Sequence, residues 1–103
     1  MASAANASHS AKVIAAATIW ARLVRILDPA GSKVITPGDP VEDHIKGGPQ
    51  AVRAFANVLN KSPEFSADGL SLVPGDMANV ATIGDIAATI IKNYESRGWT
   101  VTA

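Results

Sequence analysis

Residues 82–94, TIGDIAATIIKNY, carry the clearest helix pattern in this sequence. The apolar residues of the stretch recur at steps of three and four, which is the spacing of one helix face. They are Ile83, Ile86, Ile90 and Tyr94. Thr82 and Asp85 occupy the two key positions of a capping box, although Glu or Gln is more usual at the second. Gly98 suits a helix end, so the pattern predicts a final helix between Thr82 and Gly98.

An earlier helix is predicted to begin at a Ser8 or Ser10 cap and to continue to Leu27. It ends there because Asp28 precedes a proline, and a residue before proline is pushed out of the helical conformation. Steps of three and four predict one buried stripe, formed by Val13, Ala17, Trp20, Val24 and Leu27. The stripe is widened by Ile14, Ile19, Leu23 and Ile26.

The middle of the chain is predicted to hold one medium helix between irregular segments. The helix runs from Pro49 to Asn60, because proline suits a first helical turn. Its apolar face is Val52, Phe55, Val58 and Leu59. The loop before it, residues 28–48, is rich in Pro and Gly and is pinned to the core by Val34, Ile35, Val41 and Ile45. After the helix, residues 61–74 are irregular, with Leu70, Leu72 and Val73 turned inward, and residues 75–80 hold one short helical turn.

Composition narrows the class of protein. The chain has 103 residues, the size of one domain. Basic and acidic residues are equal at nine each, so the basic excess of a nucleic-acid binder is missing. The absence of cysteine excludes disulfides and cysteine metal sites. Lys12, Arg22 and Arg25 interrupt the early apolar stretch, and no basic region precedes it, so we expect no signal peptide, no membrane insertion and a cytoplasmic protein.

Four short segments match a known family in their order and spacing. LSLVPGD at residues 70–76 and VATIGDI at residues 80–86 resemble the part of acyl and peptidyl carrier proteins that follows helix two. That part has alternating apolar residues, a proline and a short third helix. ITP at residues 35–37 and VED at residues 41–43 resemble the family's loop into helix two. The likeness extends over residues 10–96.

The resemblance implies an all-α fold: an acyl-carrier-protein-like four-helix bundle with a long loop between helices one and two. The carrier-like domain is expected at residues 8–98. A flexible N-terminal segment at residues 1–7 precedes it, and a C-terminal tail at residues 99–103 follows it.

The chain departs from the family at the residue that defines it. Carriers begin helix two with Asp-Ser-Leu, and the serine holds 4′-phosphopantetheine. Here the matching stretch is HIKGGPQAV at residues 44–52. The serine falls opposite Pro49, Gln50 or Ala51, and matching the buried positions favours Ala51. None of the three has a hydroxyl, so no covalent cofactor is expected.

A second departure concerns charge. Family members have an acidic second helix, which basic patches on their enzymes recognise. Between Lys46 and Lys61 this chain has Arg53 and no acidic residue. Because charge complementarity governs encounter rate and partner choice, the usual partners of carriers should bind poorly.

Several other residues could have a functional role, and each of them also has a simpler structural interpretation. His44 next to Asp43 could titrate near neutral pH, or be a surface loop histidine. Gly47-Gly48 could cradle an anion, or only permit the turn before the helix. The carboxylates of Asp39, Glu42 and Asp43 could bind a cation weakly, or be solvated. Trp99 could fold back on the first helix, or mark a contact surface.

These patterns predict a non-catalytic, carrier-like protein that acts through contact with a protein partner, without nucleic acid, metal or cofactor. The candidate interaction residues are His44, Lys46, Gln50, Arg53 and Trp99. Three alternatives stay open: an atypical carrier that works on covalent or bound acyl groups, a small enzyme that uses His44 and Asp43, and an unrelated helical bundle.

Overall fold

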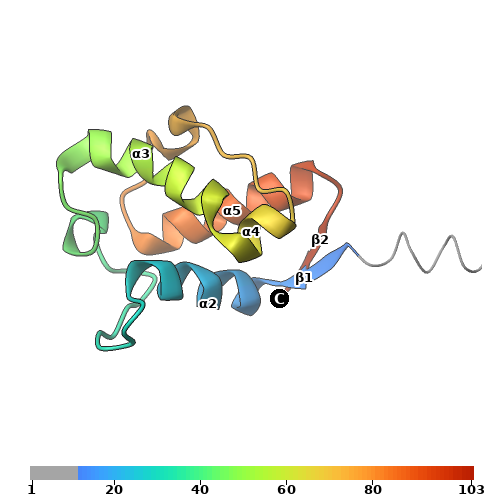
Figure 1. Cartoon of the computed structure of the whole chain (residues 1–103), viewed down its shortest axis with the longest axis horizontal. Coiled ribbons are helices and arrows are strands. Elements are labelled where there is room, and N and C mark those ends of the chain that lie inside the picture. Colours follow the sequence, from blue (N-terminus) through green and yellow to red (C-terminus); the bar gives the residue numbers. More distant parts are fainter. Residues whose placement is uncertain (1–11) are drawn as a thin grey trace, which may run out of the picture.

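The computed structural model describes residues 12–103, and within them the protein is mostly helical. Its α-helices are α2 (Ala16–Leu27), α3 (Gly48–Lys61), α4 (Pro63–Ala67) and α5 (Ile83–Ser96). Two 3-10 helices, η1 (Val41–Asp43) and η2 (Pro74–Met77), and two strands, β1 (Val13–Ala15) and β2 (Thr100–Thr102), complete it. Figure 1 shows α2 running opposite to α3 and α5, with the loop after α2 crossing one end of the helices.

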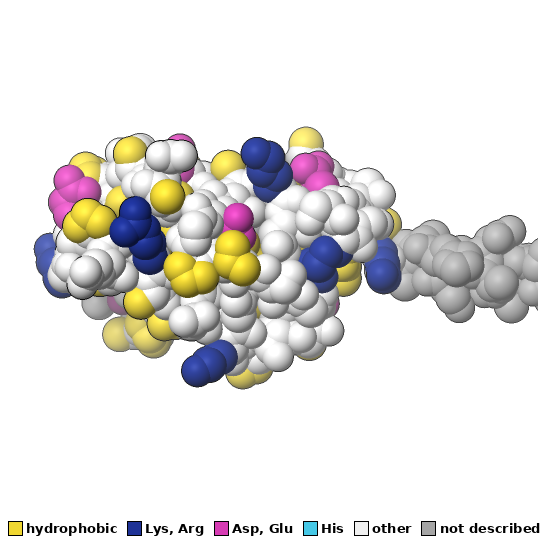
Figure 2. All heavy atoms as spheres, turned by 90° about the horizontal axis from the view of Figure 1, so that it is seen from above, with side chains coloured by type: hydrophobic (Ala, Val, Ile, Leu, Met, Phe, Trp, Pro, Cys, Tyr) yellow, Lys and Arg dark blue, Asp and Glu magenta, His cyan; other side chains and the backbone are white. Residues whose placement is uncertain are grey.

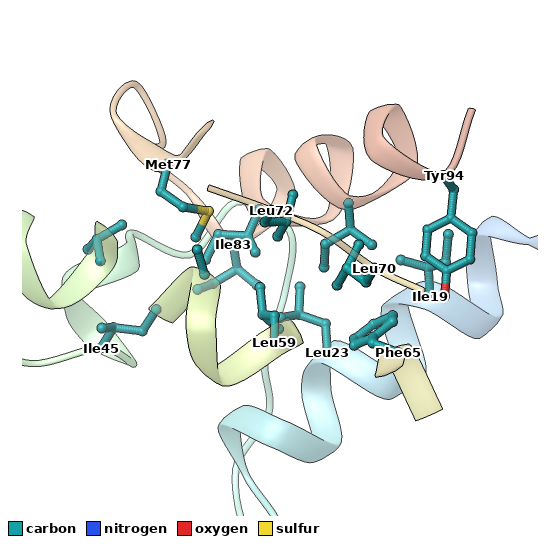
Figure 3. Close-up of a cluster of buried hydrophobic side chains, with 14 of the residues drawn as sticks. Ile19, Leu23, Ile45, Leu59, Phe65, Leu70, Leu72, Met77, Ile83 and Tyr94 are labelled. Carbon is teal, nitrogen blue, oxygen red and sulfur yellow. The ribbon is translucent and has the colours of Figure 1, made fainter. Parts of the chain in front are cut away.

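A single cluster of buried side chains joins all four helices. Each helix contributes residues with no exposed surface. They include Ile19 and Leu23 of α2, Ala56 and Leu59 of α3, Phe65 of α4, and Ile83, Ile86, Ile90 and Tyr94 of α5. Figure 3 shows side chains from separate elements, among them Leu59, Leu72 and Ile83, converging on one interior. The cluster is built mainly from aliphatic side chains, as expected from a sequence with few aromatics.

The sequence prediction for α5 is confirmed. Thr82 is the N-cap, and its hydroxyl accepts a hydrogen bond from the Asp85 N–H at 3.2 Å. The Asp85 carboxylate accepts one in return from the Thr82 N–H at 3.0 Å, which completes the capping box. Beyond the helix, Gly98 has a φ of 91°, a left-handed conformation that favours glycine.

The predicted start of the first helix is wrong, and its predicted buried stripe is correct only in part. Residues 13–15 form β1, so the helix begins at Ala16; Ser8 and Ser10 lie outside the described residues. Ile19 and Leu23 are fully buried, whereas Ala17 is exposed and Val13 is 50% exposed. Apolar residues cover most of the α2 surface, so periodicity alone did not select the inward face. The predicted end at Asp28 is correct, since the Asp28 N–H still donates to the Val24 carbonyl.

The expectation of an all-α fold is also wrong in part. β1 and β2 form a parallel two-stranded sheet, with Val13 beside Thr100 and Ala15 beside Thr102. Sequence patterns gave little sign of it because both strands are only three residues long and parallel partners are distant along the chain. Residues 99–103, expected as a tail, therefore include one strand of this sheet.

The segment after α3 is more ordered than predicted. Pro63–Ala67 forms α4, a single helical turn that the expectation of irregular structure over residues 61–74 missed. Leu70 and Leu72 turn inward as predicted, but Val73 is 57% exposed. η2 covers part of the predicted short turn.

Main-chain hydrogen bonds attach the long loop to the start of α5. The Val41 N–H donates to the Ala81 carbonyl at 3.0 Å, and the Ile83 N–H donates to the Asp39 carbonyl at 3.0 Å. The Gly84 N–H donates to the Pro37 carbonyl at 2.9 Å. A Cβ at Gly84 would lie 2.9 Å from that same oxygen, so glycine is required for the close approach.

The apolar residues predicted to pin this loop do so unequally. Val41 and Ile45 are buried, and Ile35 packs partly against the core. Val34 is 88% exposed and pins nothing.

Ile90→Ala should lower the free energy of unfolding by about 2–5 kcal/mol, because it removes a fully buried side chain and leaves a cavity. Val34→Ala, also an aliphatic truncation, should change it by less than about 0.5 kcal/mol because Val34 is exposed. Chemical denaturation of the two variants measures both values. Equal effects would contradict the assigned core.

Candidate functional site

The turn before α3 depends on two glycines. Gly47 has a φ of 112° and Gly48 a φ of 76°, both in the left-handed region. A Cβ at Gly47 would also lie 2.8 Å from the Ala51 Cβ. The two glycines therefore set where α3 begins, and Pro49 follows inside its first turn.

The N-terminus of α3 carries no side-chain cap. Gly47 is the N-cap, and the first turn contains no acidic residue. The free N–H groups and the helix dipole therefore leave this end with partial positive charge. Gln50 is exposed, and Ala51 is partly buried against the core. Of the three positions predicted to match the carrier serine, Gln50 is thus more accessible than Ala51.

An apolar pocket of about 420 Å³ lies beside this helix end, between η1, α3 and η2. It is lined mainly by aliphatic side chains together with two charged ones. The lining residues are Val41, Glu42, Ile45, Gly48, Pro49, Val52, Arg53, Met77, Ala78 and Val80. Mostly apolar pockets of this size with a few polar groups are typical of binding sites.

The two charged lining residues lie on different walls. Glu42 belongs to η1 and Arg53 to α3. Both are exposed, and neither side chain makes an ion pair with another residue of the described chain. The Lys46 amine, on the connection between the walls, donates to the Glu42 main-chain carbonyl at 2.9 Å. Figure 2 views the side of α3 and η2, where basic and acidic side chains are scattered singly among apolar ones.

His44 is placed differently from either sequence interpretation. Its side chain is only 8% exposed, so it is not a surface loop histidine. Its Nε2 lies 2.8 Å from the Asp39 carboxylate, and Asp43 is exposed and is not its partner. The sequence suggested Asp43, the adjacent acid, as the partner of His44, but the turn of η1 brings the more distant Asp39 to the ring. His44 Nδ1 is buried without a hydrogen-bond partner in the described chain.

Asp39 is the centre of a small network that closes this loop. The Thr36 hydroxyl donates to its carboxylate at 2.5 Å and the Thr36 N–H donates at 3.1 Å. These bonds, led by that of the Thr36 hydroxyl and followed by that of His44, lower the pKa of Asp39 to about 2. Because Asp39 is ionised, the His44 Nε2–H donates to it. The network holds the loop that bears the η1 wall.

Trp99 directly precedes β2, and β2 lies at the opposite end of the molecule from the start of α3, beside which the pocket lies (Figure 1). Its ring packs edge-on against Tyr94 at 5.1 Å between centroids. It also lines a shallow hollow with residues of β1 and α2, among them Ile14 and Thr18. Trp99 therefore folds back toward the first helix, which is one of the two roles expected from the sequence. Trp99 consequently does not share a site with Lys46, Gln50 and Arg53.

Sequence reasoning missed a polar cluster near Trp99. The Arg22 guanidinium and the Tyr94 hydroxyl both donate to the Asp68 carboxylate, at 2.7 and 2.8 Å. Arg97 donates to the Asp68 carbonyl at 2.6 Å. Burial and the neighbouring Asp68 carboxylate raise the pKa of Tyr94 well above its ordinary value. These bonds connect α2 with the ends of α4 and α5. Arg22 Nε and Arg97 Nη2 are buried without a hydrogen-bond partner within the described residues.

Asp39, Glu42 and Asp43, considered as weak cation ligands, are not brought together as a metal site. Within residues 12–103, no group of three His, Cys, Asp or Glu residues is arranged to hold a metal ion. No helix in the same part of the chain is long and apolar enough to cross a membrane.

Comparisons of this chain with protein-family models, curated proteins and solved structures give no match. The likeness to carrier proteins therefore rests on the segments quoted from the sequence.

His44→Ala should lower the free energy of unfolding by about 1–3 kcal/mol, because it removes a buried ring and leaves Asp39 without one of its donors. Asp43→Ala, one residue earlier, should change it by less than about 0.5 kcal/mol, because the Asp43 side chain is exposed. Urea denaturation measures both. Equal losses would contradict the pairing of His44 with Asp39.

The Asp39 carboxylate should stabilise the fold above pH 3.8, its ordinary pKa, and this contribution should be lost as the pH falls through about 2. Thr36→Val removes the hydroxyl donor and should raise the pKa of Asp39 toward 3.8. Carbon-13 NMR titration of the carboxylates measures the shift. The pKa of Asp85, which is lowered by the Ala81 and Thr82 N–H groups, should not move and serves as the control.

Proposed function

We propose that this chain is a carrier-like protein-interaction module that acts without covalent phosphopantetheine. The site formed by the start of α3 and the adjoining pocket contacts a protein partner. The module has no catalytic residue of its own, and we place it in the cytoplasm.

The order and direction of the helices support a carrier-like arrangement. A long loop separates α2 from α3, and η2 precedes α5, as the resemblance implied. α2 runs opposite to α3 and α5 (Figure 1). The acyl-carrier-protein-like four-helix bundle is part of this proposal. α4 and the β1–β2 sheet are features of this chain that the family pattern did not lead us to expect.

The observation that carries the proposal is the chemistry of α3. A phosphodiester to phosphopantetheine needs a hydroxyl at the start of the helix, where free N–H groups stabilise phosphate. Gly48–Lys61 contains no serine, threonine or tyrosine at any position. The helix end suited to an anion is present, but the oxygen to which the group would be attached is not.

The charge of α3 also favours a changed partner. Arg53, the charged residue of α3 that lines the pocket, is exposed, and the helix has no acidic residue. A partner with a basic patch at this site would be repelled by Arg53, whereas one with an acidic side chain would be attracted.

An atypical carrier that holds acyl groups without a covalent bond is the second candidate. The aliphatic pocket beside α3 favours it, because its lining would accept a hydrocarbon chain. The small-enzyme alternative is weakened, because the His44 ring is buried and paired with Asp39 instead of Asp43.

Incubation with a phosphopantetheinyl transferase and coenzyme A should leave the mass of the protein unchanged. Intact mass spectrometry measures it, with a known carrier protein as the positive control. A gain of one phosphopantetheine by the wild-type chain would refute the proposal.

Gln50→Ser and Ala51→Ser restore a hydroxyl at two of the three matching positions. If the surface is carrier-like, the exposed position 50 should accept the group more readily than the partly buried position 51. The same mass measurement reads both variants, and Ser62, just beyond α3, should stay unmodified in each.

A further inference from the structure

The pocket beside α3 has a floor that is apolar and two walls of opposite charge. Val41, Ile45, Val52 and Met77, which line it, are at most 9% exposed. Their packing leaves about 420 Å³ open instead of closing it. Such a pocket can accept the anchor side chain of a partner, where complete loss of water makes apolar contact most favourable.

The α3 wall is electropositive for two independent reasons. The exposed Arg53 guanidinium lies one turn along the helix, unpaired within the described chain. The first turn of α3, which contributes Gly48 and Pro49 to the lining, has no side-chain cap and no acidic residue. Both features favour a carboxylate on the partner at this wall.

The η1 wall has the opposite sign. Glu42 lines the pocket and Asp43 follows it, and both side chains are exposed and unpaired within the described residues. Lys46 lies close by, but its amine is directed to the Glu42 main-chain carbonyl, which leaves the carboxylate free. A basic side chain of the partner is therefore favoured at this wall.

We infer that the pocket binds a polypeptide segment of a partner protein in which one bulky aliphatic or aromatic side chain lies between an acidic and a basic residue. The apolar side chain enters the pocket, the acid pairs with Arg53, and the base pairs with Glu42. The opposite charges of the two walls fix the direction of the segment. The inference rests on the proposed function and names the partner chemistry of that same site.

Selection of a random peptide library displayed on phage, with the wild-type protein as bait, tests this directly. Enriched peptides should carry a bulky apolar residue flanked by one acid and one base. Arg53→Glu should weaken binding of such a peptide by about tenfold, since an attraction becomes a repulsion. Selection with the Arg53→Glu variant as bait should enrich peptides that carry a basic residue at the position where the wild-type protein selects an acidic one.

Two further variants separate the pocket from the helix surface. Ala78→Trp fills the mouth of the pocket from an exposed lining position and should weaken binding by about thirtyfold or more. Lys61→Glu makes the same charge reversal on α3 outside the lining and should have no effect. Circular dichroism establishes that each variant is folded.

Peptides whose charges do not follow the Arg53 reversal, or whose binding survives Ala78→Trp, would overturn the inference. The absence of any enriched peptide would also overturn it. So would a binding titration in which decanoate binds and no peptide does, which would assign the pocket to a small amphiphile. These outcomes leave the phosphopantetheinyl transferase experiment unaffected. A mass gain in that experiment would instead remove the proposed function itself.

Discussion

The buried stripe of α5 is the interaction on which the rest of the structure depends. Ile83, Ile86, Ile90 and Tyr94 have no exposed surface, and they belong to the same cluster as the buried residues of the other three helices. Burying a side chain of this size contributes about 1.5–3 kcal/mol, so the loss of any one of the four would remove a substantial fraction of the small net stability of a domain. The capping box at Thr82 fixes where this stripe begins.

The same helix start positions the candidate site. The main chains of Pro37, Asp39 and Val41 are hydrogen-bonded to the residues at and just before the first turn of α5. That attachment, reinforced by the bonds of Thr36 and His44 to Asp39, holds η1 across from α3. The pocket therefore results from two independent constraints, a loop attached to α5 and a helix whose beginning is set by Gly47 and Gly48.

The proposed function depends on two features of α3, its positively charged first half and its lack of a hydroxyl side chain. Carrier chemistry needs a hydroxyl at the helix start, and α3 contains none. The positive end of α3 lies beside Arg53 and an apolar pocket. In the proposed function this arrangement binds a carboxylate on another protein.

Elements that local interactions specify could be predicted from the sequence. α5 lies where the capping box and periodicity placed it, α3 begins and ends within one residue of the prediction, and α2 ends at the residue before Pro29. The lack of a hydroxyl side chain in α3 and the basic character of this helix could be predicted from the sequence alone. These features could be read directly because caps, prolines and helix faces act over a few neighbouring residues.

Only the tertiary structure decided the remainder. It selected Ile19 and Leu23 as the inward face of α2, paired β1 with β2, and turned His44 inward to Asp39. It also brought Met77 and Val80 of the η2 region to the pocket formed by η1 and α3. Each of these depends on contacts whose partners are separated along the chain or by the turn of a loop. The sequence by itself determined the three longer helices and the lack of a hydroxyl in α3, because these follow from neighbouring residues, whereas the site required distant segments to meet.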